Sequence, residues 1–513
     1  MASSPARAKF LDRALVAAQV RPGRVMAWVL GLHIVVWTLL PILLGGNLQL
    51  DVVEGLALGK EWQLGYFKHP PLPWWLADLS YRLTGEVRAV ALLGPLASAA
   101  CIYVVWRFAR EVVDERRALI AALALEGLHF LSISGIKFNH DVLLLPFWAL
   151  TGWFFYRGVA WGRARDWVLS GAFLALAFWS KYAAFALAAT LGLILLLDPA
   201  ARRAWRTPGP YLMAAAFLIV LGPNLWWLIE SDFQPLRYVE GRAVTAADWV
   251  QFLTFPLRWI VSQVAFIFPA IVLVALAYFG ASRAHPDSDR VALRIVTALA
   301  FGPFLITTLL AALLGRMLVP SWGYPLWIFA TLAAVMWLGP VAGRERLRRF
   351  AIGFLVVFAA FPVGYFASEL FEPFLRDRAK ATEFPGRLLA DTVTRDWRSR
   401  TGTPLRYVSG ADFGTTGAGE FAANNVAVYS PDRPHVLVHG DPKLSPWIDM
   451  AEFERHGAVF VWQQRPAETD MPAGLRAAFP RAELRPSLVL PRRTLNPRVR
   501  PEQIGYAILP PQR

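Results

Sequence analysis

Residues 25–45 read VMAWVLGLHIVVWTLLPILLG, an apolar run of about the length that crosses the hydrocarbon core of a bilayer. Similar runs follow near 87–107, 118–135, 141–157, 166–180, 182–197, 211–229, 251–280, 291–314, 318–338 and 351–371. Of the 513 residues, 56% are apolar and 17% are charged, whereas a soluble domain has roughly 45–50% and about 25%. We therefore predict a mainly α-helical, polytopic membrane bundle of about eleven spans, and exclude a soluble enzyme, a disordered chain and a disulfide scaffold.

Basic residues fall in every second loop, and this alternation predicts the orientation. They lie before the first span and in the loops holding Arg107/Arg110/Arg116/Arg117, Arg157/Arg163/Arg165, Arg202/Arg203/Arg206, Arg283/Arg290/Arg294 and Arg344/Arg346/Arg348/Arg349. Cytoplasmic loops collect Lys and Arg, so we expect the N-terminus inside and an odd number of spans. The same rule explains the net charge of +15 without a nucleic acid as a partner.

The composition changes after Phe371, which divides the chain into a transmembrane domain, 1–371, and a C-terminal domain, 372–513. Short apolar stretches bounded by Gly, Pro, Asn and Asp predict strands at 405–408, 426–429, 435–438 and 459–462. Helices are expected at 388–400 and 448–456. The orientation places this small α/β domain outside, which in a bacterium is the periplasm, with the bundle in the inner membrane.

The first outer loop carries acids, bases and a stiff corner. Asp51 follows the first span almost directly, and a helix over 51–60 would place Asp51 and Glu54 on one face. Pro70-Pro71 fixes the backbone after Lys68 and His69, so these two side chains should have defined positions. Alternatively, the two acids only cap a helix and remain solvated.

The segment 72–83 (LPWWLADLSYRL) predicts an amphipathic helix at the membrane interface, with Trp74 and Trp75 at headgroup depth.

The other outer connections supply further polar residues near span ends. They are Asp141, Lys181, Tyr182, Asn224, Arg237, Arg316 and Trp322. Asp141 could simply cap a helix, and Lys181 could snorkel to the interface. Taken together, two or three carboxylates and several cations on one face suit an anionic, lipid-anchored substrate that meets a base.

Some signals are discounted. Asp287-Ser288-Asp289 imitates a nucleotide-sugar metal motif but falls in a predicted cytoplasmic loop, and Gly414–Gly419 lacks the spacing of a phosphate loop. Glu126 and His129 are intramembrane ionisable groups that serve either function or a helix–helix contact. His69 has no second histidine nearby and Cys101 is the single cysteine, so a divalent metal is not indicated and no cofactor is predicted.

Several of these segments together resemble the bacterial members of glycosyltransferase family 39, relatives of protein O-mannosyltransferases and of the aminoarabinose transferase that acts on lipid A. The resemblance covers roughly residues 25–340. It rests on Asp51, Gly65–Leu72 (GYFKHPPL), Asn139–Leu145, Ser180–Tyr182, Pro223–Trp226 and Ser321–Tyr324. His-Pro-Pro is its most specific element.

The resemblance implies a GT-C fold and transfer of a hexose or pentose, usually with inversion, from a polyprenyl-phosphate donor to an acceptor hydroxyl. It implies that Asp51 is the general base or orients the acceptor, with Asp141 assisting. Lys181 would pair with the donor phosphate, and Arg237 and Arg316 are further candidates for that charge. Lys68, His69, Tyr182, Asn224 and Trp322 are expected to bind substrate.

One departure concerns the second acid. The family usually has Asp-Glu after the first span, whereas here Asp51 is followed by Val52-Val53-Glu54. Either Glu54 takes the role from one helical step away, or the role is absent.

Two other functions remain open, a transporter or flippase of lipid-linked sugars and a membrane anchor that presents the C-terminal domain. The sequence names neither the sugar nor the acceptor, which could be lipid A, another glycolipid or a protein, and it gives no oligomeric state.

Overall fold

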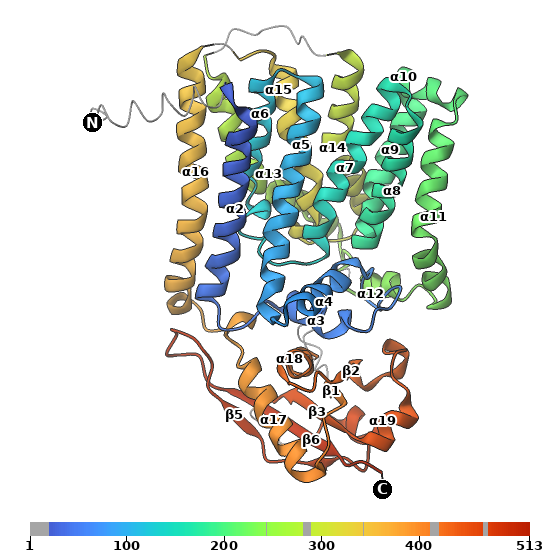
Figure 1. Cartoon of the computed structure of the whole chain (residues 1–513), viewed down its shortest axis with the longest axis vertical. Helices are drawn as coiled ribbons and strands as arrows, with labels where there is room; N and C mark the ends of the chain where they lie inside the picture. Colours follow the sequence, from blue (N-terminus) through green and yellow to red (C-terminus); the bar gives the residue numbers. More distant parts are fainter. Residues whose placement is uncertain are drawn as a thin grey trace, which may run out of the picture.

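The computed structural model describes residues 20–242, 244–280, 289–341, 343–410, 420–464 and 470–512. A bundle of long helices stands on a smaller domain built around a β-sheet, and short helices lie between the two (Figure 1). The membrane-bundle class and the small C-terminal sheet domain predicted above are confirmed.

Among the described residues, seven helical segments are long and apolar enough to cross a membrane. They are α2 (Pro22–Leu44), η1–α5 (Val87–Val112), α7 (His140–Trp161), α11 (Gly209–Glu230), α13 (Trp249–Tyr278), α14 (Arg290–Leu313) and α16–η7 (Arg344–Leu375). Two bent pairs raise the number to nine if each is one span: Tyr182–Leu197 with Pro199–Arg206, and Pro320–Trp327 with α15 (Ala330–Leu338). The count of eleven therefore stays a prediction.

α8 (Ala164–Ser180) is shorter than these segments and packs against both α7 and α11. α9 (Phe185–Leu197) follows it and lies against α14. Predicted spans at 166–180 and 182–197 thus correspond to helices, with the break between them at Lys181.

The stretch 118–135 is not one continuous helix, and the prediction is wrong there. α6 (Glu115–Ala124) gives way to two 3-10 turns, Leu125–Gly127 and His129–Leu131. The cause is local packing and polarity. Glu126 turns to bond His33 of α2, with 3.0 Å between carboxylate and ring nitrogen, and Gly127 packs directly on the backbone of Ala270.

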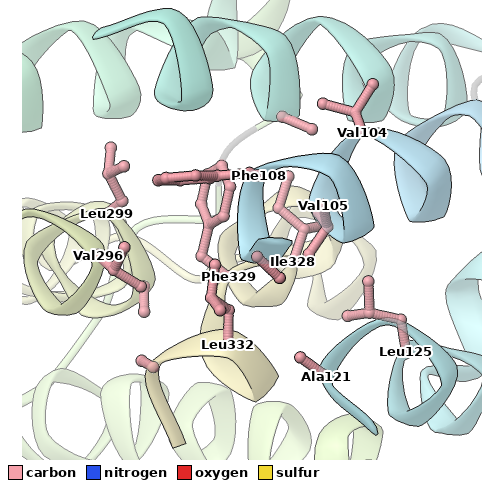
Figure 2. Packing of buried hydrophobic residues seen from close by; sticks show 14 of the residues in the cluster. Val104, Val105, Phe108, Ala121, Leu125, Val296, Leu299, Ile328, Phe329 and Leu332 are labelled. Atoms are coloured by element: carbon pink, nitrogen blue, oxygen red, sulfur yellow. The ribbon is translucent and has the colours of Figure 1, made fainter. Parts of the chain in front are cut away.

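The bundle core is filled by aliphatic and aromatic side chains from α5, α6, α14 and the segment entering α15 (Figure 2). Phe329 stands at its centre and meets Phe108 edge to face, with ring centroids 5.9 Å apart. Gly152 of α7 lets that ring approach, because a Cβ there would lie 2.7 Å from it.

The C-terminal domain has one six-stranded mixed sheet of order β2-β1-β3-β6-β4, with β5 also paired to β6. The strands are β1 (Tyr407–Gly410), β2 (His435–Leu437), β3 (Ala458–Gln463), β4 (Glu483–Leu484), β5 (Leu488–Leu490) and β6 (Glu502–Leu509). β1 pairs in parallel with β2 and β3, and β6 pairs antiparallel with its neighbours.

The helices of this domain are α17 (Gly386–Thr401), α18 (Phe421–Tyr429), α19 (Met450–His456) and α20 (Ala473–Ala478). The expected helices at 388–400 and 448–456 are present as α17 and α19. The strand expected at 426–429 is wrong, because this stretch is the end of α18, buried almost all round between the sheet and α3. A helix that is buried on all sides has no 3.6-residue periodicity of apolar residues, so its sequence cannot be distinguished from that of a buried strand by pattern alone.

Three short helices separate the bundle from the C-terminal domain: α3 (Leu50–Gly59), α4 (Leu72–Thr84) and α12 (Gln234–Arg242) (Figure 1). α4 starts where the sequence predicts. Trp74, however, is buried between the rings of Tyr66 and His140, with centroids 4.5 and 5.4 Å away, so its ring packs against protein, and its depth in the membrane stays a prediction. The C-terminal domain covers this end of the bundle.

The loops predicted to be cytoplasmic gather at the other end, away from the C-terminal domain (Figure 1). Arg157 pairs with Asp166 on the following helix at 3.3 Å. Arg294 pairs with Asp198 at 2.5 Å, and Arg346 donates to the carbonyl of Gly280 at 2.6 Å. The described parts of the alternating basic loops thus share one end, as expected, whereas Arg283 lies outside the described residues. The side of the membrane that this end faces stays a prediction.

Candidate active site

The N-terminus of α7 joins three of the loops that the sequence singles out. The Asn139 side-chain nitrogen donates to the Asp51 carboxylate at 2.9 Å. The His140 ring nitrogen Nε2 lies 3.1 Å from the carbonyl oxygen of Pro70. The Asp141 carboxylate accepts from Lys181 Nζ at 2.5 Å. Three consecutive residues therefore bring α3, the Pro-Pro corner and the α8–α9 junction together.

Helix capping at Asn139 explains how the side chains of residues 139, 140 and 141 reach three different segments. Asn139 is the N-cap of α7, and its side-chain oxygen accepts from the backbone N–H groups of Asp141 and Val142. This is the usual use of Asn before a helix, and it leaves the side-chain nitrogen for Asp51. A continuous set of hydrogen bonds therefore links Asp51, Asn139, Asp141 and Lys181, here called the Asp51–Lys181 network.

Lys181 occupies a break between helices. α8 ends at Ser180, and Lys181 is extended before the 3-10 turn that starts α9. Its ammonium also lies 5.9 Å from the ring centre of Trp322, in the 3-10 segment η6 (Pro320–Trp327). Because an ammonium has three donors and the side chain is half-buried, Lys181 has donors beyond the one that meets Asp141.

The first outer loop folds back on itself. The backbone groups of Tyr66 and His69 bond each other in both directions, at 3.0 and 3.2 Å. Gly65 lies so close to α11 that a Cβ there would come within 2.1 Å of the Trp227 ring. The corner holds the His69 ring 4.0 Å from the His140 ring, centre to centre, so the expected fixed position of His69 is present.

Tyr182 and Asn224 form a second link to this loop. The Tyr182 hydroxyl donates to the Asn224 side-chain oxygen at 3.1 Å, and the Asn224 nitrogen donates to the carbonyl of Leu64 at 2.7 Å. Both residues are thus joined to loop one, although Asn224 is fully buried and acts here through its contacts with Tyr182 and Leu64.

Lys68 and Glu54 belong to a different, buried group. Lys68 Nζ lies 2.6 Å from the Glu54 carboxylate and 3.7 Å from that of Glu420, a residue of the C-terminal domain. Burial raises the pKa of the Glu54 carboxyl, and the nearby Glu420 and Asp51 raise it further against the opposing effect of Lys68. Burial opposes the Lys68 charge, but Glu54 and Glu420 raise the pKa of Lys68 above its ordinary value.

Glu54 therefore contacts Lys68 while Asp51 contacts Asn139, although both acids come from α3.

The two arginines suggested for the donor phosphate are not members of the Asp51–Lys181 network as defined above. Arg237 is on α12, is largely exposed and pairs with Asp232. Arg316 is half-buried, and its backbone pairs with that of Thr245 between α14 and η6. The next residue on α12, Tyr238, meets the rings of Phe67 and His69 at 6.1 and 6.2 Å, which places α12 beside loop one.

Sequence reasoning assigned no role to four residues that the structure places here: Asn139, His140, Glu420 and His439. The first two stand beside Asp141 in a matched motif, which was the available signal. Glu420 and His439 lie in a domain whose role the sequence did not reveal, and no local pattern marks them.

The signals discounted above have structural explanations where they are described. Glu126 makes the helix–helix contact with His33. Asp289 caps α14, whereas Asp287, Ser288 and 414–419 lie outside the described residues. Within the described part of the chain, no group of three or more His, Cys, Asp or Glu side chains is placed to hold a metal ion.

Comparisons with known proteins concern the family and the fold of the chain. Residues 68–227 match the family model of dolichyl-phosphate-mannose-protein mannosyltransferases. ArnT from Cupriavidus metallidurans, solved bound to undecaprenyl phosphate, superposes with a TM-score of 0.63 over 96% of this chain and 100% of that one, at 14% identity. Its apo structure gives 0.62 over 96% and 99%, also at 14% identity.

The chain has the GT-C fold. The resemblance to glycosyltransferase family 39 is thereby confirmed.

A curated relative is the lipid A galacturonosyltransferase RgtD of Rhizobium johnstonii, 27% identical over 282 residues. That alignment covers 54% of this chain and 57% of the relative. The chain thus spans a little over half the length of the curated relative that it matches.

Proposed function

We propose that this protein is an integral-membrane glycosyltransferase that moves a sugar from a polyprenyl-phosphate donor to a hydroxyl of lipid A or a related glycolipid. The observation that carries the proposal is the Asp51–Lys181 network, which joins a half-buried carboxylate to a half-buried ammonium at one end of a GT-C bundle. The name of the curated relative, a lipid A galacturonosyltransferase, supports lipid A as the acceptor to test first.

The geometry suggests how each group would act. The sugar C1–oxygen bond to the donor phosphate breaks while a new bond forms from C1 to the acceptor oxygen. The acceptor proton passes to Asp51, which Asn139 orients through its 2.9 Å hydrogen bond. A carboxylate in hydrogen-bond reach of the attacking group is suited to this proton transfer.

Charge grows on the leaving polyprenyl phosphate as its bond to the sugar breaks. Lys181 is a preorganised cation for that charge, because Asp141 fixes one of its three donors. The Trp322 ring beside the ammonium adds a second constraint. Arg237 and Arg316 remain further candidates for binding that charge.

We place this end of the bundle and the C-terminal domain on the periplasmic face of a bacterial inner membrane. The alternation of basic loops supports this orientation. It is tested by phosphatase fusions, which should be active after Phe371 and inactive after Arg346.

The central experiment supplies the purified protein with radiolabelled polyprenyl-phosphate galacturonate and lipid A. Aminoarabinose and mannose donors serve as comparisons, since relatives handle different sugars. The expected result is labelled lipid A with one donor only and a product that Asp51→Asn does not form. Movement of the donor across proteoliposomes without product would instead support a flippase.

A further inference from the structure

Lys68 is enclosed by groups from both domains. Glu54 and Glu420 flank its ammonium, and the rings of Phe67 and Tyr238 lie 5.0 and 5.7 Å from it. The Glu54, Lys68 and Glu420 side chains are all at least nine-tenths buried. With His439, which pairs with Glu420, they form what is called here the Lys68 cluster.

The C-terminal domain holds Glu420 in place by a constrained turn. Glu420 directly precedes α18, the helix that packs on α3. The His439 ring nitrogen Nε2 pairs with one Glu420 oxygen, while the backbone of His439 has a φ of 54°. A residue other than glycine adopts this left-handed conformation at a cost and keeps it only when its surroundings fix it.

Lys68 directly precedes His69 and Pro70, two residues of loop one that contact His140 of α7. The His69 ring packs against the His140 ring, and the carbonyl oxygen of Pro70 lies 3.1 Å from Nε2 of the same histidine. A carboxylate that fixes the Lys68 ammonium therefore also fixes the part of loop one that contacts His140, the residue between Asn139 and Asp141 of the Asp51–Lys181 network. Glu420 is connected to the reacting end through one side chain.

We propose that Glu420 is a positioning residue of the transferase site, supplied by the C-terminal domain, held by His439 and acting through Lys68. This inference rests on the proposed function, in which Asp51 and Lys181 act on the substrate and the donor phosphate. It assigns the C-terminal domain a direct part in the site in addition to covering it. If Glu420 only attached the two domains to each other, the loss of any other interdomain contact would affect sugar transfer equally.

A matched interdomain pair offers the control. Glu61 of the same loop pairs with His435 of the same domain, with 2.9 Å between carboxylate and ring nitrogen, yet it is no part of the Lys68 cluster. E420Q and E61Q each remove one interdomain charge and keep the side-chain volume. For E420Q we expect the donor KM to rise between about ten- and a hundredfold, with kcat within about twofold of wild type, and for E61Q we expect both within about twofold.

Equal donor KM values for E420Q and wild type would overturn the proposal, as would an equal rise in E61Q. If E420Q does not fold, E420D replaces it, because it keeps the charge. A donor KM of E420D between those of wild type and K68Q supports the view that Glu420 positions Lys68 through its charge. A loss of both kcat and thermal stability in E420D contradicts that view.

Two further measurements separate this inference from the proposed function. In a K68Q background, E420Q should leave the donor KM unchanged, and additive effects would contradict action through Lys68. Acylation of Lys68 by an amine-reactive reagent, read by mass spectrometry, should be several-fold faster in E420Q than in wild type or E61Q. If acylation is faster in E420Q but the protein transfers no sugar, the Glu420–Lys68 contact is supported and the proposed function is contradicted. If acylation is unchanged in E420Q, the Glu420–Lys68 contact itself is contradicted.

Discussion

Two polar groups lie at the same end of the bundle and are built differently. The Asp51–Lys181 network comes wholly from the membrane domain, and Lys181 and Asp141 keep 14% and 15% of their side chains exposed. The Lys68 cluster draws on both domains, and Lys68 and Glu420 keep 6% and 3%. The first keeps part of its charged side chains exposed, and the second is almost wholly buried.

We infer from this difference that the first group is suited to the proposed reaction and the second to fixing its surroundings. A buried ion pair is costly to form and costly to break, and removing one partner leaves an uncompensated charge. The Lys68 cluster is therefore suited to fixing two domains in one arrangement. The Asp51–Lys181 network keeps partly hydrated groups that can exchange partners when a donor phosphate arrives.

The largest effect should follow the loss of the proposed base. Asp51→Asn keeps the hydrogen-bonding shape beside Asn139 but removes the proton acceptor. We expect kcat for sugar transfer to fall by about 10²- to 10⁴-fold, measured with radiolabelled donor. Asp449→Asn, which alters the exposed cap of α19 in the C-terminal domain, is the control and should retain activity. Undiminished transfer by the Asp51 variant would remove this residue from the mechanism.

Loss of the ammonium should have the next largest effect. Lys181→Met removes the charge that faces Asp141 and Trp322, and we expect about a 10²- to 10³-fold loss of kcat. Because Asp141 acts through Lys181, adding Asp141→Asn to this variant should cost little more. Independent, multiplying effects of the two substitutions would show that the pair is not one unit.

A smaller effect is expected from the backbone of loop one. A Cβ at Gly65 would lie 2.1 Å from the Trp227 ring, so Gly65→Ala must displace the loop that carries His69. We expect about a tenfold loss of kcat/KM from this misplacement. Gly192→Ala in α9 meets nothing within 4 Å and should be silent. Full activity of the Gly65 variant would show that the loop position is not critical.

The attachment of the two domains should affect stability more than chemistry. The Arg433 side chain donates to the carbonyl of Leu56 at 3.2 Å and lies 3.7 Å from the ring centre of Tyr81. Arg433→Ala should lower the free energy of unfolding by about 2 kcal/mol, measured by denaturant titration in detergent. Transfer at low temperature should stay within about twofold of wild type, and a tenfold loss would show that attachment and catalysis are not separable.

The last prediction concerns how stability depends on pH. Burial, assisted by Arg433, lowers the pKa of Lys60 to about 7, while its Nζ contacts the carbonyls of Arg433 and Pro434 at 2.6 and 2.5 Å. Between this pKa and the ordinary value of about 10.4, the unfolded chain binds a proton that the folded chain does not, so stability should rise with pH. Thermal unfolding should show a rise from pH 7 to 9 that Lys60→Met lacks, and equal pH profiles of the two proteins would contradict it.

The sequence predicted the membrane bundle because apolar runs and basic loops are local patterns. It also predicted Asp51, Asp141 and Lys181 as neighbours, since motif order and loop parity put them at one end. It missed the break in 118–135, which depends on Glu126 meeting His33 and Gly127 meeting Ala270. It missed Glu420 because its partner Lys68 is hundreds of residues away and only the folded chain brings the two together. It missed His439 with it, since His439 joins the cluster through Glu420.

The most direct test of the central claim is a structure of this protein with a polyprenyl phosphate bound. The account predicts a phosphate oxygen within about 3 Å of Lys181 Nζ, on the side of Lys181 where Asp51 can reach the sugar. A phosphate held at the opposite end of the bundle, among the basic loops of Arg107 and Arg163, would contradict it.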